Sequence, residues 1–186
     1  MIRSDQHVTV APAEIVFRVA ADVERWPEIL PHYRWVRFEK KDGFGRGVVE
    51  MAAWRDFLGP LRWPTWWKSM MEADPDEPIV RYKHIGGITT GMDVEWLFLP
   101  AEEGTVVRII HEWEGPPWPL ISRFAANRVI GPHFVSFIAQ RTLKGVCAEA
   151  ERLTALETRS GSEHAARSRS DGAADADGRA EERDDA

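Results

Sequence analysis

The sequence predicts an α+β domain in which one strand and two short helices precede six consecutive strands and a long helix. Three observations lead to this prediction. Apolar residues recur with a period of two between about residues 33 and 114, and with a helical period from about residue 120 to 157. Glycine and proline clusters leave only short connections between the strands, which is typical of an antiparallel meander. The apolar stripe of the last helix needs a partner surface, which the sheet can supply.

The N-terminal part is predicted to hold the first strand and both short helices. Residues 6–10 alternate and favour a strand. Pro12 stands where a helix begins, because a missing N–H costs nothing in the first turn. Asp22 is expected to cap a second helix over residues 23–29, which Pro31 ends.

The six following strands are each bounded by turn residues. They are predicted over residues 33–41, 47–57, 65–73, 79–85, 92–99 and 105–114, with turns at 42–45, 74–78 and 102–104. Residues 59–64 contain two prolines and are interpreted as a rigid loop.

The C-terminal helix is predicted to follow a break at residues 115–119. Helical spacing returns at Leu120, Gly131-Pro132 ends a short first piece, and the long helix begins at about His133. We expect its apolar stripe, and above all its first three members, to face the sheet: Phe134, Phe137, Ile138, Val146, Leu153 and Leu156.

Composition divides the chain of 186 residues after Glu157. The last 29 residues hold five Arg and eight acidic residues but no large apolar side chain. Such a segment buries too little apolar surface to offset its chain entropy, so residues 158–186 are predicted to be a disordered charged tail. Residues 1–157, with 24 − 5 = 19 basic and 30 − 8 = 22 acidic residues, form one domain by length.

Several classes of protein are excluded by charge and composition. A net negative domain without basic blocks argues against nucleic-acid binding. Apolar runs are far shorter than the ~20 residues that span a bilayer, and the first residues lack the apolar core of a signal peptide, so we expect a cytoplasmic protein. The single cysteine, Cys147, excludes an internal disulfide. The histidines show no metal-site spacing and no phosphate-binding loop is present, so neither a metal nor an organic cofactor is expected.

The segment from Asp22 to Tyr33 (DVERWPEILPHY), together with the predicted order of elements, resembles the START-like superfamily, also called SRPBCC, helix-grip or Bet v 1-like. Within it, the chain is most similar to polyketide cyclases/aromatases and to coenzyme Q-binding-type proteins. The resemblance covers about residues 4–157. It implies a helix-grip fold, β-α-α-β6-α, in which a curved seven-stranded antiparallel sheet wraps around the long helix and leaves an apolar cavity between them.

Strand alternation independently predicts a mostly apolar wall on one face of the sheet. Side chains that share this inner face alternate with charged residues on the outer face. The candidate cavity residues are Trp67, Ser69, Met71, Tyr82, Met92, Val94, Trp96, Ile109, His111 and Trp113 from the strands, and Phe134 and Phe137 from the helix. An apolar wall with a few polar groups is typical of a small-molecule pocket, although an ordinary core has the same composition.

Three residues are candidates for chemistry. The resemblance implies that Tyr33 faces the pocket, where its hydroxyl could donate a hydrogen bond to a substrate carbonyl or act as a weak acid. Met71 and His84 occupy positions where the cyclase branch uses arginines; His84 could act as a donor or, with a near-neutral pKa, as an acid or base. Arg55 shares its strand face with inward residues and could supply the missing cation. The alternatives are that His84 is an ordinary core histidine and that the Arg55 side chain reaches solvent.

Two loops rich in Trp and Pro are expected to form a mouth or lid of the cavity. Their candidate residues are Trp63 and Trp118, with Phe124 from the following segment. Arg62, Arg123 and Arg128 would add a cationic rim that favours an acyl carrier protein or a membrane surface. The alternative is that these tryptophans pack on the edge of the core.

The resemblance implies that the protein binds an aromatic or polyketide-like small molecule and guides its aldol cyclisation and dehydration. Two other functions remain open. A non-enzymatic carrier of quinone or lipid needs only the apolar wall, and a tryptophan-rich surface could bind a protein partner.

Overall fold

The computed structural model describes residues 1–56, 62–115 and 135–178, with side chains described as far as Gly161. The chain forms two compact units, Met1–Glu151 and Arg152–Ala186. The first unit contains the whole sheet, the short helices and the beginning of the long helix. Every residue considered for the functional site lies in this unit.

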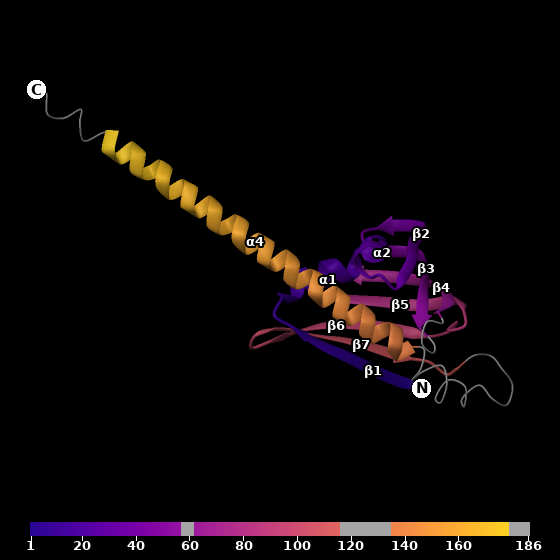
Figure 1. Cartoon of the computed structure of the whole chain (residues 1–186). Coiled ribbons are helices and arrows are strands. Elements are labelled where there is room, and N and C mark those ends of the chain that lie inside the picture. The colour runs from indigo at the N-terminus through magenta and orange to yellow at the C-terminus, as the bar shows by residue number, and fades with distance from the viewer. Residues whose placement is uncertain (57–61, 116–134, 179–186) are drawn as a thin grey trace, which may run out of the picture. The chain divides into compact units, whose positions relative to one another are not determined.

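A single antiparallel sheet of seven strands forms the first unit (Figure 1). The strands are β1 (Ile2–Thr9), β2 (Tyr33–Gly43), β3 (Arg46–Asp56), β4 (Arg62–Asp74), β5 (Ile79–Gly87), β6 (Asp93–Ala101) and β7 (Gly104–Glu112). Their spatial order is β1-β7-β6-β5-β4-β3-β2. Strands β2 to β7 are therefore a meander, and β1 pairs with the last of them. The predicted fold class and the order of elements are confirmed.

The short helices stand between β1 and β2. Pro12 precedes helix α1 (Ala13–Ala21), as the sequence predicted, and the buried face of α1 reaches β6, where the Phe17 and Phe98 rings meet edge to face at 5.7 Å. A 3₁₀ turn, η1 (Val23–Arg25), leads into α2 (Trp26–Ile29). Asp22 makes no side-chain capping hydrogen bond to η1, so its expected capping role is wrong.

Strand β4 begins earlier than predicted, at Arg62. The expected loop over residues 59–64 is therefore wrong for its last three residues, while residues 59–61 lie outside the described part. Pro64 pairs with Trp54 of β3, but pairing of β4 with β5 starts only at Trp67. A proline is tolerated here because β4 has a neighbouring strand on one side only, so the missing N–H breaks no second ladder.

The long helix α4 (Ser136–Gly178) begins within the first unit, where its first turns cross one face of the sheet (Figure 1). Its buried apolar stripe consists of Ile138, Ala139, Leu143, Val146, Cys147 and Ala150, so Ile138 and Val146 are buried as predicted. Phe137 is only half-buried, and the Arg141 guanidinium covers its ring at 4.7 Å. The prediction that Phe137 faces the sheet is wrong, because the buried stripe at this end of α4 passes through Ile138 and Ala139. Phe134 lies outside the described residues.

The far end of the predicted stripe is also exposed. Leu156 keeps 46% of its surface accessible, and Leu153 is half-buried. Both belong to the second unit, in which α4 continues to Gly178. The domain boundary after Glu157 and the disorder of residues 158–186 remain predictions.

One glycine allows the tight turn that joins β6 to β7. Gly104 pairs with Ala101 and has a φ of 103°, a conformation that other residues rarely adopt. A Cβ atom at Gly104 would lie 2.1 Å from the carbonyl oxygen of Thr9. The absence of a side chain therefore lets the turn approach the end of β1, and it fixes the pairing of β1 with β7.

Candidate functional site

A cavity lies between the inner face of the sheet and the first turns of α4. It is lined by Trp26, Tyr33, Met51, Trp67, Tyr82, His84, Thr89, Met92, Val94, Trp96, Ile109, His111, Val135, Ile138, Ala139 and Thr142. The space measures about 80 Å³, which is below the ~300–1,000 Å³ of a typical small-molecule pocket. The described residues therefore enclose an apolar space with a few polar groups, sized for one small ring.

Aromatic rings hold Tyr33 in place at one end of the cavity. The centroid of its ring lies 5.1 Å from that of Trp26, 6.0 Å from that of Trp67 and 4.8 Å from that of His32. Tyr33 begins β2, and Trp26 belongs to the short helix that precedes it, so the WPEILPHY segment brings both rings together. Packing against three rings leaves the Tyr33 ring little rotational freedom.

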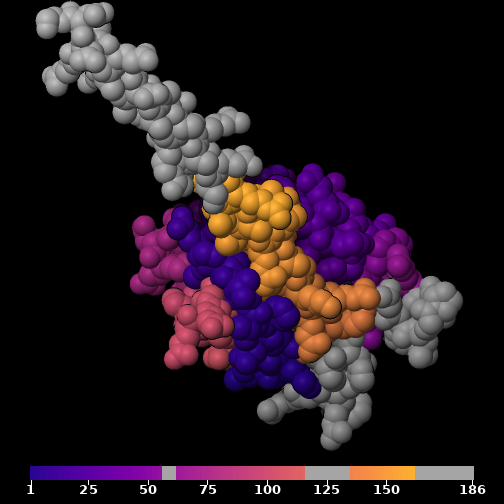
Figure 2. Space-filling view, turned by 60° about the vertical axis from the view of Figure 1, so that its left-hand side comes forward, coloured from indigo at the N-terminus to yellow at the C-terminus, as the bar shows by residue number. Residues whose placement is uncertain are grey.

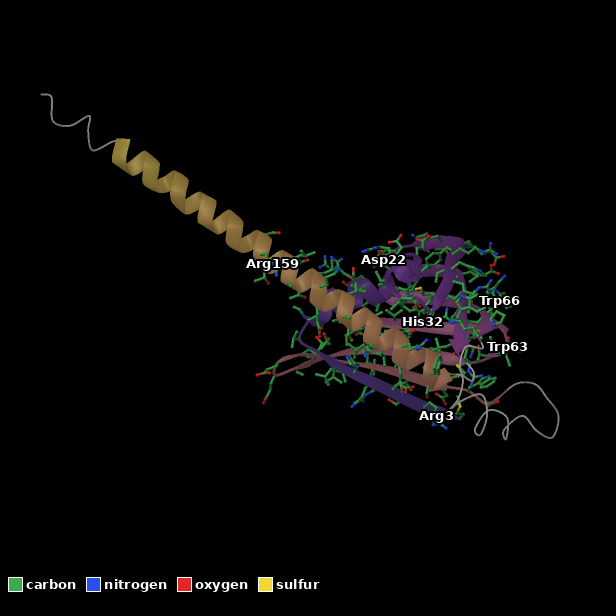
Figure 3. The ribbon with its side chains drawn as sticks, in the orientation of Figure 1. Arg3, Asp22, His32, Trp63, Trp66 and Arg159 are labelled. Atoms are coloured by element: carbon green, nitrogen blue, oxygen red, sulfur yellow. The ribbon has the colours of Figure 1, made fainter. Side chains whose placement is uncertain are left out.

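The Tyr33 hydroxyl lies 3.4 Å from Oγ1 of Thr142, which α4 provides. The Thr142 hydroxyl donates to the carbonyl of Ile138 at 2.8 Å. Because this hydroxyl has one hydrogen, which the shorter bond to Ile138 takes, its lone pairs remain to accept from Nε2 of His32, 3.1 Å away. The 3.4 Å contact between the Thr142 and Tyr33 hydroxyls is longer than an ordinary O–H···O bond, so the Tyr33 hydrogen is available to another acceptor. Figure 3 shows His32 beside α4. Burial raises the pKa of Tyr33 far above its usual value, so the phenol stays protonated.

A close approach of α4 makes this contact with His32 feasible. A Cβ atom at Gly145 would lie 2.2 Å from Cδ2 of Leu30, a side chain that is 1% exposed. Gly145 therefore allows α4 to approach the segment that carries Leu30 and His32. The sequence singled out neither Gly145 nor Thr142.

Tyr82 provides a second buried phenol. Its Oη has no hydrogen-bond partner among the described residues, although the side chain is only 6% exposed and lines the cavity. Burial and the neighbouring Tyr33 raise the pKa of Tyr82, so this hydroxyl is also protonated. A buried hydroxyl without a partner costs free energy unless a ligand or a water satisfies it, which makes Tyr82 a donor available to a bound molecule.

His84 stacks on Trp67, with the ring centroids 6.4 Å apart, and its Nδ1 lies 2.6 Å from Oγ1 of Thr89. Burial, together with the nearby His111 and Lys83, lowers the pKa of His84 to about 3. The near-neutral pKa expected from the sequence is therefore wrong, because the sequence does not reveal that the ring lies in the cavity wall and stacks on Trp67. His84 serves as a neutral hydrogen-bonding group.

His111 lies on β7, on the same inner face as Ile109. It is 7% exposed, and its Nδ1 has no hydrogen-bond partner among the described residues. Burial lowers the pKa of His111 to about 4, and the carboxylate of Asp5 opposes this shift. His111 is therefore neutral at physiological pH, and it is a stronger base than His84.

The two buried histidines predict an acid-labile fold. Below the ordinary pKa of 6.5 the unfolded chain binds protons at both residues, while the folded protein does not until about pH 4 and pH 3. Stability should therefore fall as the pH falls through this window, by up to ~1.4 kcal/mol per pH unit for each histidine. Denaturant unfolding between pH 7 and pH 5 measures the slope, and His84→Gln should make it shallower. An equal slope in this variant would show that His84 is not held neutral.

The structure brings most of the predicted cavity residues together. Those that line the space are Tyr33, His84, Trp67, Tyr82, Met92, Val94, Trp96, Ile109 and His111. Ser69, Met71 and Trp113 are buried on the expected face but do not line the space, and neither does Phe137. Arg55 is half-buried and is not among the lining residues, so its role as the cation of the cavity remains a prediction.

The residues that the sequence missed come mainly from the helices and from a turn. They are Trp26, Met51, Thr89, Val135, Ile138, Ala139 and Thr142. Met51 could have been predicted, because the alternation of side chains along β3 places it on the inner face of the sheet. Ile138 was expected to face the sheet but not to line the cavity, and the predicted stripe did not include Val135, Ala139 or Thr142.

The predicted mouth is only partly described, because Trp118, Phe124, Arg123 and Arg128 lie outside the described residues. Trp63 is 66% exposed at the start of β4, and Figure 3 shows it close to Trp66 at the end of the sheet. Neither tryptophan lines the cavity. The place of Trp63 in a mouth or lid therefore remains a prediction.

A surface groove of about 470 Å³ adjoins the cavity. It is lined by Ile29, Leu30, Pro31, His32, Trp54, Arg62, Arg141, Lys144, Gly145 and Ala148. Three of these residues are basic and none is acidic, although the chain as a whole has a net charge of -6. The hydrogen-bonded pair of His32 and Thr142 lies between the groove and the cavity, since His32 lines one and Thr142 the other.

In the parts of the chain that the structure describes, no cluster of three or more His, Cys, Asp or Glu residues could hold a metal ion. Within the same parts, no helix has the length and hydropathy needed to cross a membrane.

Comparison with known proteins agrees with this architecture. Residues 10–131, more than half of the chain, match the family described as polyketide cyclase/dehydrase and lipid transport. The chain belongs to this family. Within curated proteins, the granaticin polyketide synthase bifunctional cyclase/dehydratase of Streptomyces violaceoruber is 31% identical over 105 residues. That match covers 55% of this chain but only 31% of the relative.

Solved structures show that the family fold is shared over most of the chain. The Zhui aromatase/cyclase from Streptomyces sp. R1128 has a TM-score of 0.60 at 23% identity, with 82% of this chain and 95% of that chain covered. A START superfamily protein from Mycobacterium smegmatis has a TM-score of 0.61 at 14% identity, with 82% and 98% covered. The seven-stranded sheet and C-terminal helix are therefore the helix-grip fold of the START/Bet v 1 superfamily, as the resemblance implied.

Proposed function

We propose that this protein guides the aldol cyclisation and dehydration of an aromatic or polyketide-like molecule bound in the cavity. The observation that carries this proposal is the pair of buried, protonated tyrosine hydroxyls, Tyr33 and Tyr82, in one apolar space. The family and the cyclase relatives support the same role. The granaticin cyclase/dehydratase is much longer than this chain, so its full activity is not assigned to this protein.

The two phenols would act as hydrogen-bond donors to carbonyl oxygens. In an aldol closure, a carbon next to one carbonyl loses a proton to a base such as water and attacks a second carbonyl, whose oxygen gains negative charge and then takes up a proton, so that the step consumes none overall. Donors already oriented toward that oxygen stabilise the transition state more than the ground state. His84, neutral and fixed between Trp67 and Thr89, would assist by hydrogen bonding to a neighbouring oxygen.

The cavity would act chiefly by positioning. A flexible poly-ketone chain can close in several ways, and a space for one ring selects a folded conformation in which two reacting carbons meet. At about 80 Å³, the space would hold the ring-forming part of such a chain and not its whole length.

Transport of a quinone or lipid is the second candidate, and the apolar lining favours it. The small volume argues against a long isoprenoid or acyl tail in this conformation. Native mass spectrometry of the freshly purified protein distinguishes the two. A retained quinone or lipid would favour the carrier.

Turnover of a synthetic poly-β-ketone thioester tests the cyclase. We expect the protein to enrich one cyclic product over the mixture that forms spontaneously, measured by chromatography of the products. Met71→Leu is a matched control, because Met71 is buried on the inner face without lining the cavity, and it should retain this product preference. A product mixture identical to the uncatalysed one would contradict the proposed function.

Delivery of the substrate by an acyl carrier protein would use the basic groove. Arg62, Arg141 and Lys144 would meet the acidic surface of such a partner, and His32 and Thr142 place the groove next to the cavity. Docking to a membrane surface is the alternative partner for the same cations. Both partners remain proposals.

A further inference from the structure

Two buried polar atoms on neighbouring strands have no hydrogen-bond partner in the described part of the chain. Asp5 on β1 is 8% exposed and His111 on β7 is 7% exposed. Neither Oδ2 of Asp5 nor Nδ1 of His111 has a hydrogen-bond partner among the described residues. Buried polar atoms in native proteins are nearly always satisfied by protein, water or ligand, so each of these two atoms needs an explanation.

The register of the sheet brings both side chains to one place. Asp5 pairs with Ile109 and His111 pairs with Arg3, so Asp5 and His111 project from the same face of neighbouring strands and are offset by two residues. Diagonal neighbours of this kind have Cα atoms about 7–8 Å apart. Ile109 and His111 both line the cavity, so the pair lies at the edge of that space.

Helix α4 orients the carboxylate of Asp5. Nε2 of Gln140 donates to Oδ1 at 3.0 Å, which leaves Oδ2 as the remaining acceptor. Figure 2 shows α4, in orange, lying against the N-terminal strand in indigo. The Asp5 carboxylate also opposes the effect of burial on the pKa of His111, so the two groups interact electrostatically.

The chemistry of the two atoms selects the group that fits between them. A carboxylate oxygen only accepts hydrogen bonds, so the bound group must donate to it. A neutral imidazole with its hydrogen on Nδ1 donates, so the same group must also accept. A hydroxyl oxygen does both, whereas a carbonyl cannot donate and an ammonium cannot accept.

We propose that Asp5 and His111 form a subsite that binds one hydroxyl oxygen of the ligand, with a water molecule in its place when the ligand is absent. The identity of that ligand rests on the proposed function: the aldol product, before it loses water, is a β-hydroxy ketone. Its hydroxyl would lie against Asp5 and His111, and its carbonyl would face Tyr33 and Tyr82. Asp5 is thus a residue that determines specificity.

A high-resolution crystal structure of the free protein tests the subsite without any ligand. We expect an ordered water within hydrogen-bond distance of both Oδ2 of Asp5 and Nδ1 of His111. A direct hydrogen bond between these two atoms, or protein partners that satisfy both, would overturn the proposal. This outcome does not depend on whether the protein is a cyclase.

Ligand titration tests hydroxyl recognition, with phenol and toluene as probes of nearly equal shape and of a size suited to the cavity. Asp5→Asn keeps the acceptor for Gln140 and replaces Oδ2 by an amide NH₂, which cannot accept from a hydroxyl. We expect the preference for phenol over toluene, measured as a ratio of Kd values, to fall about tenfold or more in this variant. Toluene affinity should change less than twofold.

Ser69→Ala is the matched control, because it removes another buried hydroxyl that lacks a partner among the described residues and lies outside the lining. It should leave the phenol preference unchanged. An unchanged preference in Asp5→Asn, or no binding of phenol to the wild-type protein, would overturn the subsite. If the preference falls as expected but no poly-ketone is turned over, the subsite stands and the proposed cyclase function fails.

Discussion

Replacing Leu143 by alanine is expected to lower the free energy of unfolding by about 2–5 kcal/mol. Leu143 is 1% exposed in the part of α4 that belongs to the first unit, so the change leaves a void that the close-packed surroundings fill only in part. Denaturant unfolding followed by tryptophan fluorescence measures the loss.

The same substitution farther along α4 is the control. Leu156 is 46% exposed, so Leu156→Ala should change stability by less than about 1 kcal/mol. Equal losses in the two variants would mean that the beginning of α4 is not packed on the sheet. Phe137→Ala should fall between them, because Phe137 is half-buried under Arg141.

Tyr33→Phe is expected to reduce the rate of cyclisation about a hundredfold, while ligand affinity changes by only about 1 kcal/mol. A donor aimed at developing negative charge is worth ~3 kcal/mol in the transition state, whereas a neutral hydrogen bond in simple binding is worth ~1 kcal/mol. The ring contacts with Trp26, Trp67 and His32 do not involve the hydroxyl, so the fold should be retained.

Tyr33→Phe leaves the hydrogen bonds of the neighbouring buried groups intact. Thr142 keeps its hydrogen bonds to Ile138 and His32 when the Tyr33 hydroxyl is removed, so no buried group loses its last partner. Single-turnover rates and Kd values should be measured with the same series of ligands on wild type and variant. Effects below 1 kcal/mol on both quantities would remove Tyr33 from the catalytic role and favour the carrier.

Alternation and turn residues were sufficient to predict the sheet. Each strand carries its own period, so the six strands of the meander and the inward side chains of β4 to β7 could be predicted without knowledge of their neighbours. This prediction depends on local sequence alone. The place of Tyr33 was implied by the family resemblance of the segment that ends in it, in which Trp26 and Tyr33 meet directly.

Three features were decided only by tertiary structure. The alternation of side chains along a strand shows which face of the sheet each one lies on, but not its position along the cavity. Ser69, Met71 and Trp113 are therefore on the inner face and buried without lining the space. The contribution of α4, above all Thr142, depends on how the helix is rotated against the sheet, which the approach at Gly145 permits. The low pKa of His84 arises chiefly from desolvation, which is a property of the whole packed core and not of any segment. The same packing leaves atoms of Asp5, Tyr82 and His111 without a hydrogen-bond partner among the described residues.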